Sequence, residues 1–221
     1  MNKNIFDSLY KKYHIVLKKQ FNYDVGKNMS QTFWQFKTDK KENLFDMTKF
    51  CNISIKKFLP SENYIQLNMN NLDKYLNLPK YVLKKWNNGI IRDEQLSEII
   101  RCAILTKYGG TWLDNDIILT KEIDNDILSA PLYIMKVPSY YTDSDFSFFN
   151  YLQNFGNIFS LKNPLIPSNS WLIHSKQNHH LMRYTLALLL EYWKNEDKNT
   201  DNLFEHFSLM VSTAIDDGLI S

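Results

Sequence analysis

The sequence predicts an α/β domain with a mostly parallel central sheet and flanking helices. Short segments of strand character alternate with longer segments whose apolar residues recur every three or four positions. Apolar residues make up 44% of the 221 residues, with only six glycines and six prolines, so the chain is globular rather than disordered. Strands that alternate with helices favour parallel pairing, because a parallel connection crosses over through a helix.

Composition and charge exclude several classes of protein. The net charge of +2 argues against general nucleic-acid binding. No apolar run is long enough to span a bilayer, and the polar N-terminus is unlike a secretory signal. Cys51 and Cys102 lie in apolar helical segments, where reduced core thiols are expected. We therefore expect a cytoplasmic protein.

Residues 1–28 are expected to form an amphipathic helical segment ahead of a single domain at residues 29–221. Lysines are frequent there, and apolar side chains recur at helical spacing at Phe6, Leu9, Tyr10, Tyr13, Val16 and Leu17. The favoured interpretation is a helix that docks on the core with its lysines in water. The alternative is a helix that lies on a membrane surface and is attracted to anionic lipid.

The first half of the domain is predicted as strand, helix, strand and helix. Residues 30–37 alternate and are rich in aromatics, as in a strand. Residues 44–58 place an apolar stripe on one helical face, and residues 63–68 form a short second strand. Residues 79–89 begin with proline and stop at glycine, the usual limits of a short helix.

A longer helix follows, with Asp93 as its expected N-terminal cap and Gly109-Gly110 as its end. Residues 111–119 are predicted as the next strand. The remaining elements are a strand, a loop, a strand and two helices, at residues 132–137, 138–157, 168–175, 178–194 and 202–215. In sheets of this kind, ligands bind at the carboxyl ends of the strands.

Two aspartates, Asp114 and Asp116, stand inside an otherwise apolar, strand-like segment. A carboxylate is costly to remove from water unless it is paired, hydrogen-bonded or bound to a metal. Either the strand ends before these residues and the acids face water, or a cation lies against them. The Gly-Gly turn should bring the polar flank of the preceding helix, with Ser97, Glu98 and Arg101, beside this acidic strand end. Such a pocket suits a ligand with both hydroxyls and phosphates.

The same tripeptide, Asp-Asn-Asp, recurs at residues 124–126 without a preceding Gly-Gly. A surface turn or a helix cap explains that second copy. His179 and His180 stand at the start of a helix without a partner at metal-ligand spacing, so we expect them on the surface. His206 is expected as a structural histidine.

The segment around the first copy resembles the retaining glycosyltransferases that have an Asp-X-Asp motif. The residues that carry the resemblance are Ser97, Arg101, Leu105, Tyr108, Gly109, Gly110, Trp112, Leu113, Asp114 and Asp116. The closest group is that of capsular polysaccharide synthesis, related to bacterial mannosyl- and galactosyltransferases and to the clostridial glucosylating toxins. Glu98 departs from the pattern, because the family usually has aspartate at this position.

The resemblance implies a GT-A-like nucleotide-sugar-binding domain with hexosyltransferase activity. A sugar would pass from a nucleotide diphosphate, with UDP-hexose as the expected donor, to a glycan hydroxyl with retention of configuration. The setting would be capsular or other surface polysaccharide synthesis. A lipid-linked acceptor would require peripheral contact with the inner face of the plasma membrane.

The resemblance also implies roles for single residues. Mn²⁺ or Mg²⁺ would be held by Asp116 and Asp114, and the catalytic residues would be Asp114, Asp116 and Arg101. The donor would be bound by Trp34, Ser97, Glu98, Arg101, Tyr108, Gly109, Gly110, Trp112 and Asp114. Trp34 would be a platform on which the base of the donor stacks; the alternative is an aromatic residue of the core.

Two alternatives to a polysaccharide-synthesising enzyme stay open. One is a non-catalytic sugar-nucleotide or glycan-binding module on the same scaffold, supported by Glu98 and by the few residues after the last predicted helix. The other is a toxin-like enzyme that glycosylates proteins, which would use the same pocket.

Overall fold

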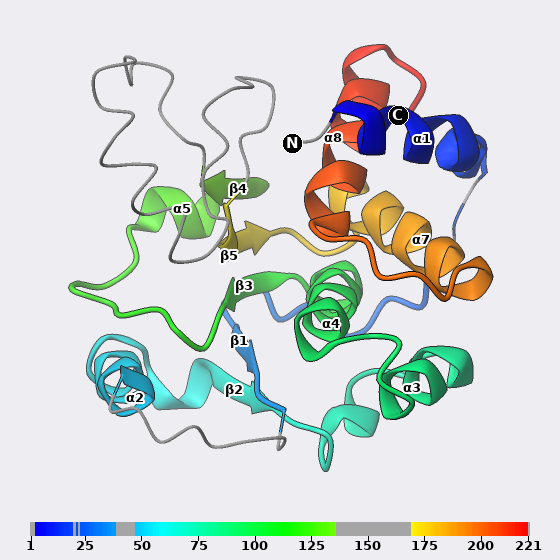
Figure 1. Cartoon of the computed structure of the whole chain (residues 1–221). Helices are drawn as coiled ribbons and strands as arrows, with labels where there is room; N and C mark the ends of the chain where they lie inside the picture. The colour runs from blue at the N-terminus through cyan, green and yellow to red at the C-terminus, as the bar shows by residue number, and fades with distance from the viewer. Residues whose placement is uncertain (1–2, 20, 22, 39–46, 136–168, 221) are drawn as a thin grey trace, which may run out of the picture.

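The computed structural model describes residues 3–19, 21, 23–38, 47–135 and 169–220. Its strands are β1 (Phe33–Phe36), β2 (Tyr64–Leu67), β3 (Gly110–Leu113), β4 (Leu132–Met135) and β5 (Asn169–Ser175). Its α-helices are α1 (Lys3–Tyr13), α2 (Met47–Phe58), α3 (Lys80–Asn87), α4 (Asp93–Tyr108), α5 (Asn125–Ser129), α7 (His180–Asn195) and α8 (Leu203–Asp216) (Figure 1). Short 3₁₀ helices occupy His14–Lys18, Ser61–Asn63 and Leu72–Lys74. The predicted loop at residues 138–157 and the predicted helix start at residues 44–46 lie outside the described residues.

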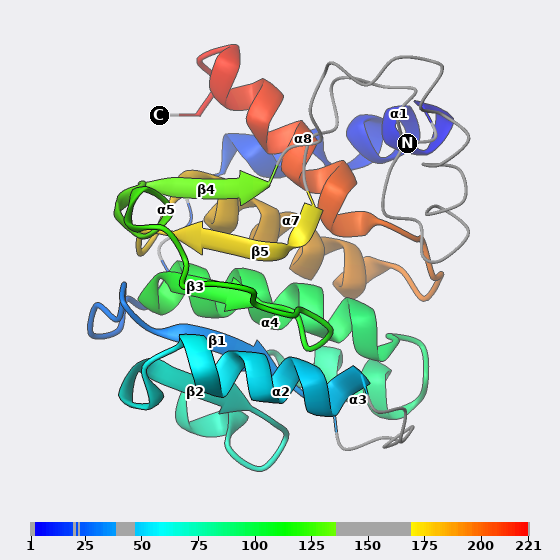
Figure 2. The same ribbon diagram turned by 90° about the vertical axis from the view of Figure 1, so that its left-hand side faces the viewer.

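The five strands form one sheet in the order β2-β1-β3-β5-β4. β1 is parallel to β2 and β3, whereas β5 is antiparallel to both β3 and β4 (Figure 2). Among the described strands, parallel pairing is therefore confined to β2-β1-β3, and the expectation of a mostly parallel sheet is not met. The reason is that β5 lies between β3 and β4 and runs opposite to both, so a single reversed strand makes both of these pairings antiparallel.

Side chains alternate between the two faces of the sheet, as the pleat requires. Trp34, Trp112 and Ile173 are partners across β1, β3 and β5, and all three are buried in the larger core with α4, α7 and α8. Their neighbours Leu113 and Leu172 face the smaller core on the other side of the sheet. Helices thus cover both faces, with α2 and α5 on the second one (Figure 1).

The Gly109-Gly110 pair joins α4 to β3 with no loop between them. Both residues have positive φ angles, +72° and +103°, which favour glycine. A Cβ atom on Gly110 would lie 2.4 Å from the Thr32 carbonyl oxygen, and one on Gly109 would lie 2.7 Å from the Gln177 backbone nitrogen. The reversal makes α4 run antiparallel to β3, so the first half of α4 lies beside the carboxyl end of β3.

The N-terminal segment docks on the core. Its apolar stripe is buried against α7 and α8, with Leu9, Tyr13, Val16 and Leu17 each at most 7% exposed. Tyr13 donates a hydrogen bond to Glu196, which also pairs with Lys12. The docking interpretation is therefore confirmed. Tyr10 is the exposed member of the stripe, at 38%, and contact of this segment with a membrane surface stays a prediction. Within the described residues, no helix is long and apolar enough to cross a bilayer.

Candidate active site

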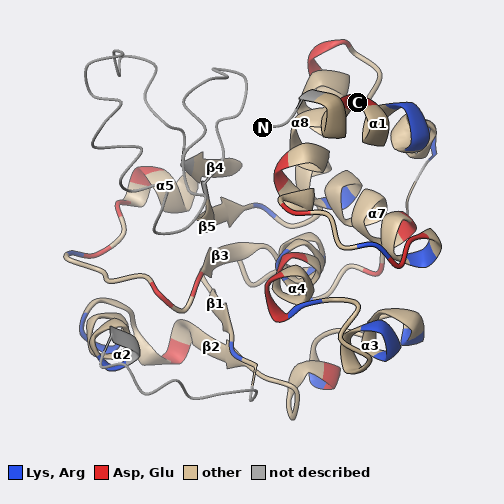
Figure 3. Cartoon of the chain, in the orientation of Figure 1, with Lys and Arg blue, Asp and Glu red and all other residues tan. Residues whose placement is uncertain are grey.

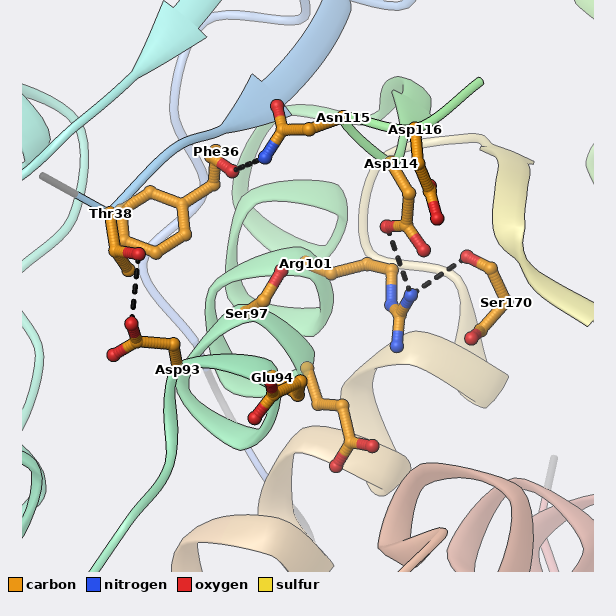
Figure 4. A pocket seen from close by; sticks show the side chains of 11 residues that line it. Phe36, Thr38, Asp93, Glu94, Ser97, Arg101, Asp114, Asn115, Asp116 and Ser170 are labelled. Carbon is orange, nitrogen blue, oxygen red and sulfur yellow. Dashed lines mark hydrogen bonds and ion pairs between the residues drawn. The ribbon is translucent and has the colours of Figure 1, made fainter. Parts of the chain in front are cut away.

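A pocket of about 380 Å³ opens at the carboxyl ends of β1 and β3, beside the start of β5 (Figure 4). The residues that line it are Phe36, Thr38, Asp93, Glu94, Ser97, Glu98, Arg101, Asp114, Asn115, Asp116 and Ser170. Those from α4 come from its first half, because the Gly-Gly reversal places that half here. The pocket therefore forms at the sheet edge where ligands of α/β proteins bind.

The strand that carries the aspartates ends earlier than the sequence predicts. β3 stops at Leu113, and the chain is then held by hydrogen bonds to both neighbouring strands. The Asp114 backbone N–H donates to the Trp171 carbonyl at 2.9 Å, and the Gln35 side-chain amide donates to the Asp114 carbonyl at 3.0 Å. The Asn115 side chain donates to the Phe36 carbonyl. Both carboxylates consequently project from a fixed loop into the pocket (Figure 4).

Arg101 holds the first of these carboxylates in place. Its side chain is only 4% exposed, and its guanidinium lies 3.6 Å from Asp114 Oδ1 while donating to the Ser170 carbonyl at 2.7 Å. Trp112 Nε1 donates to the same Asp114 oxygen at 2.6 Å. Burial raises the pKa of Asp114, and Arg101 and the Trp112 hydrogen bond oppose that rise. One Asp114 oxygen is thus committed to contacts within the protein.

Asp116 differs from Asp114 in being exposed, and no described residue gives it a hydrogen bond or an ion pair. Acidic residues gather at the loop after β3 and the first turn of α4, whereas many lysines lie on outer helices (Figure 3). A free carboxylate at an acidic pocket edge suits a hard cation such as Mg²⁺ or Mn²⁺. In the described part of the chain, no three His, Cys, Asp or Glu side chains are grouped to hold a metal ion. Asp116 and Asp114 would thus be two ligands of such a cation, and phosphate oxygens and water would have to supply the others.

Glu98 lies in the pocket wall with an unusual environment for an acid. Its Oε2 atom is buried and has no hydrogen-bond partner within the described part of the chain. Burial, and next the neighbouring Glu205 carboxylate, raise the pKa of Glu98 to about 8, while Arg101 opposes the rise. Ser97 lines the same pocket from the adjacent helical position.

Asp93 lies in the pocket but is not the cap of α4. Arg92 occupies the capping position, and its backbone N–H donates to the Gln95 side chain at 3.0 Å. The two Asp93 oxygens instead accept hydrogen bonds from Thr38 Oγ1 and Trp86 Nε1. The expected cap is therefore corrected by one residue, because Asp93 already has helical geometry and its side chain ties α4 to the end of β1.

Trp34 does not reach the pocket. It is fully buried, its Nε1 donates to the Gly109 carbonyl at 2.9 Å, and its ring packs against Tyr75 and Tyr108. It therefore offers no free face on which a nucleotide base could stack. Successive side chains of a strand point to opposite faces of the sheet, and the Trp34 side chain points to the face that the larger core covers.

The Tyr-Gly-Gly segment likewise lies away from the pocket. Tyr108, Gly109 and Gly110 sit at the start of β3, opposite the strand end that carries Asp114. Trp112 is 1% exposed and acts on the pocket only through its hydrogen bond to Asp114. Of the predicted donor-binding residues, the structure brings together Ser97, Glu98, Arg101 and Asp114, with Asp116 beside them.

Six pocket residues were not anticipated as site residues: Phe36, Thr38, Asp93, Glu94, Asn115 and Ser170. Thr38 follows β1 and Asn115 stands between the two aspartates, so their positions at strand ends were a signal that sequence reasoning could have used. Ser170 comes from the start of β5 and reaches the pocket only because β5 runs antiparallel to β3. No local sequence feature marks it.

The other expected residues have structural roles. Cys51 and Cys102 are free and buried, and burial raises the pKa of Cys102 to about 12, so both thiols stay protonated as core residues. His206 is 2% exposed, as expected of a structural histidine. His179 is partly buried at the N-terminal cap of α7, where it accepts a hydrogen bond from the Leu181 backbone, rather than fully on the surface.

Comparisons with known proteins place the chain in a family. The solved structure of the PaToxG glycosyltransferase matches with a TM-score of 0.49 and 13% sequence identity, over 97% of this chain and 77% of that chain. No curated protein matches the sequence. The family of the capsular polysaccharide synthesis protein matches residues 1–219, nearly the whole chain. The chain therefore belongs to the capsular polysaccharide synthesis protein family.

Proposed function

We propose that this protein is a metal-dependent glycosyltransferase that moves a sugar from a nucleotide diphosphate, UDP-hexose, to a hydroxyl of a glycan acceptor. The observation that carries the proposal is the composition of one pocket. A parallel strand end supplies Asp114 and the free Asp116, and the facing helix supplies the buried Arg101 and Glu98. The family assignment supports a place in the synthesis of capsular or other surface polysaccharide.

Each residue has a role in this proposal. Arg101 keeps Asp114 oriented and supplies positive charge beside the donor. Asp114 and Glu98 orient hydroxyls of the sugar or the ribose, and Ser97 adds a hydroxyl at the same wall. Asp116 and Asp114 would hold Mn²⁺ or Mg²⁺, which neutralises the diphosphate as it leaves.

The chemistry follows from the donor. The bond between the sugar C1 and the diphosphate oxygen breaks, a bond from C1 to the acceptor oxygen forms, and the acceptor proton passes to the departing phosphate. The sugar would pass through an oxocarbenium-like state, as in glycoside cleavage. We propose a GT-A-like binding domain and retention of configuration, with the acceptor entering on the face from which the diphosphate departs.

The proposed acceptor is a sugar on a lipid carrier, met in the cytoplasm at the inner face of the plasma membrane. Because Leu9 and Tyr13 of α1 are buried in the core, such peripheral contact would have to use the side chains that α1 leaves exposed, such as Tyr10, or another surface of the protein.

The test is incubation with Mn²⁺ and a panel of nucleotide sugars and glycan acceptors, followed by measurement of released nucleoside diphosphate. We expect release with one donor class, loss of release when a chelator removes the metal, and recovery when Mg²⁺ or Mn²⁺ returns. Binding of donors without release, across every acceptor, would contradict the enzyme and favour a non-catalytic module on the same scaffold.

A further inference from the structure

The first turn of α8 closes the pocket wall behind α4. The Phe204 backbone N–H donates a hydrogen bond to the Glu98 carboxylate, and the Arg101 guanidinium carbon lies 4.5 Å from the centre of the Phe204 ring. Glu205, the next residue of α8, belongs to the same group of interacting side chains. A segment near the end of the chain therefore contributes to the environment of residues that face the ligand.

The charges in this group do not balance. In the ranges that the structure describes, Arg101 is the cation that interacts with three carboxylates, those of Glu98, Glu205 and Asp114. Glu98 Oε2, Glu205 Oε2 and Arg101 Nε are each buried, and no described residue gives any of them a hydrogen bond. A buried ionised carboxylate without a partner is costly, and two neighbouring carboxylates that cannot both be ionised share a proton instead.

We propose that Glu205 is a positioning residue of the pocket, which holds one proton jointly with Glu98 at neutral pH. Glu98 then presents a neutral carboxyl at the pocket wall, which does not repel a diphosphate. Glu205 does not line the pocket and acts only through Glu98. The identity of the ligand rests on the proposed function, whereas the shared proton does not.

The direction of the pKa shifts agrees with this arrangement. Burial raises the pKa of both acids, and the Glu205 carboxylate is the second cause of the rise at Glu98, to about 8. The Asp114 carboxylate also raises the pKa of Glu98 and of Glu205, whereas the Arg101 guanidinium lowers the pKa of each. The buried thiol of Cys102 also feels the two acids, and they raise its pKa.

The sign of the pH effect on stability follows. Because Glu98 has a higher pKa in the folded protein than its ordinary value of 4.5, the folded state binds more protons than the unfolded state between about pH 4.5 and about pH 8. The contribution of the pair to stability therefore falls as pH rises through this window. A different role for Glu205, as a charged residue that stabilises the N-terminus of α8, makes the opposite prediction, because removal of that charge would destabilise the protein throughout the neutral range.

The experiment measures the melting temperature from about pH 5 to about pH 9 for the wild type, Glu205→Gln, Glu98→Gln and the double variant. We expect the wild type to lose stability between about pH 5 and about pH 8, each single variant to lose part of that slope, and the double variant to lose it. The effects of the single changes should not add, since the two residues share one proton. Asp216→Asn at the other end of α8 is the matched control and should follow the wild type.

The same variants separate this inference from the proposed function. If transfer activity is found, Glu205→Gln should move the alkaline limb of its pH profile to lower pH, because Glu98 loses its acidic neighbour and ionises more easily. If no transfer is found, the pH dependence of the melting temperature still tests whether Glu98 and Glu205 share a proton. Two results would overturn the shared proton. One is an equal loss of stability at every pH in Glu205→Gln. The other is a double variant whose melting temperature depends on pH as in the wild type.

Discussion

The tripeptide Asp-Asn-Asp occurs twice in this chain, ten residues apart, and the two copies have opposite surroundings. The first, at residues 114–116, follows a buried strand and is held between β1 and β5. The second, at residues 124–126, begins the five-residue helix α5 on the surface, with Asp124 at its capping position. The chemistry of the first copy therefore comes from the strand end and the helix that faces it, and not from the three residues themselves.

The cations that accompany the two copies show the same contrast. Arg101 is 4% exposed beside Asp114, whereas Lys121 is 72% exposed beside Asp124, whose two oxygens it contacts at 2.9 and 3.0 Å. An exposed pair is screened by water and contributes little to stability. A buried arginine whose carboxylate partners depend on it cannot be removed without leaving buried charge unpaired.

The largest expected difference between the copies concerns activity. Asp116→Asn should lower transfer by about two orders of magnitude or more, because the charge that holds the metal against the diphosphate is lost. The fold should persist, since Asp116 is exposed and supports no hydrogen bond among the described residues. Asp126→Asn is the matched control and should retain full activity. Nucleoside diphosphate release and the melting temperature of both variants check this, and equal losses in the two variants would refute the assignment of the first copy.

The second difference concerns stability. Arg101→Met should destabilise the fold by about 3 kcal/mol, because Asp114 loses its cation and the Ser170 carbonyl loses its donor inside the protein. Lys121→Met should cost at most about 0.5 kcal/mol, since its pair with Asp124 is in water. Urea unfolding at neutral pH measures both. Similar costs for the two changes would mean that the buried pair is no more important than the surface pair.

The smallest expected effect concerns the acid on the facing helix. Glu98→Ala should weaken donor binding about tenfold through the loss of one hydrogen bond to a ligand hydroxyl. Glu98→Asp should retain binding, because the carboxyl group is preserved with a shorter reach. Glu122→Ala, an exposed acid beside the second copy, is the control and should leave binding unchanged. Calorimetric titration with the nucleotide sugar is the measurement, and wild-type affinity in Glu98→Ala would show that this acid does not touch the donor.

Most elements could be predicted because their signals are local. The periodic helix before Gly109-Gly110 and the proline- and glycine-bounded α3 were found with small errors at their ends. The strand at residues 111–119 was predicted too long. Ile117 and Leu119 are apolar because they are buried under α2, where the Leu119 backbone N–H donates to Ser54, and not because they extend β3. Apolar character alone cannot separate these two causes.

By itself, the sequence determined that an arginine-bearing helix turns through two glycines into a strand that ends in two aspartates. Those features lie within about twenty residues, so helical periodicity and turn chemistry are enough to relate them. Only the tertiary structure decided that Trp34 is buried, that Ser170 joins the pocket, and that Glu205 lies behind Glu98. Each of these depends on which face of a strand is covered, or on contact between segments far apart in the chain. Such contacts are set by the packing of the whole core and leave no local pattern.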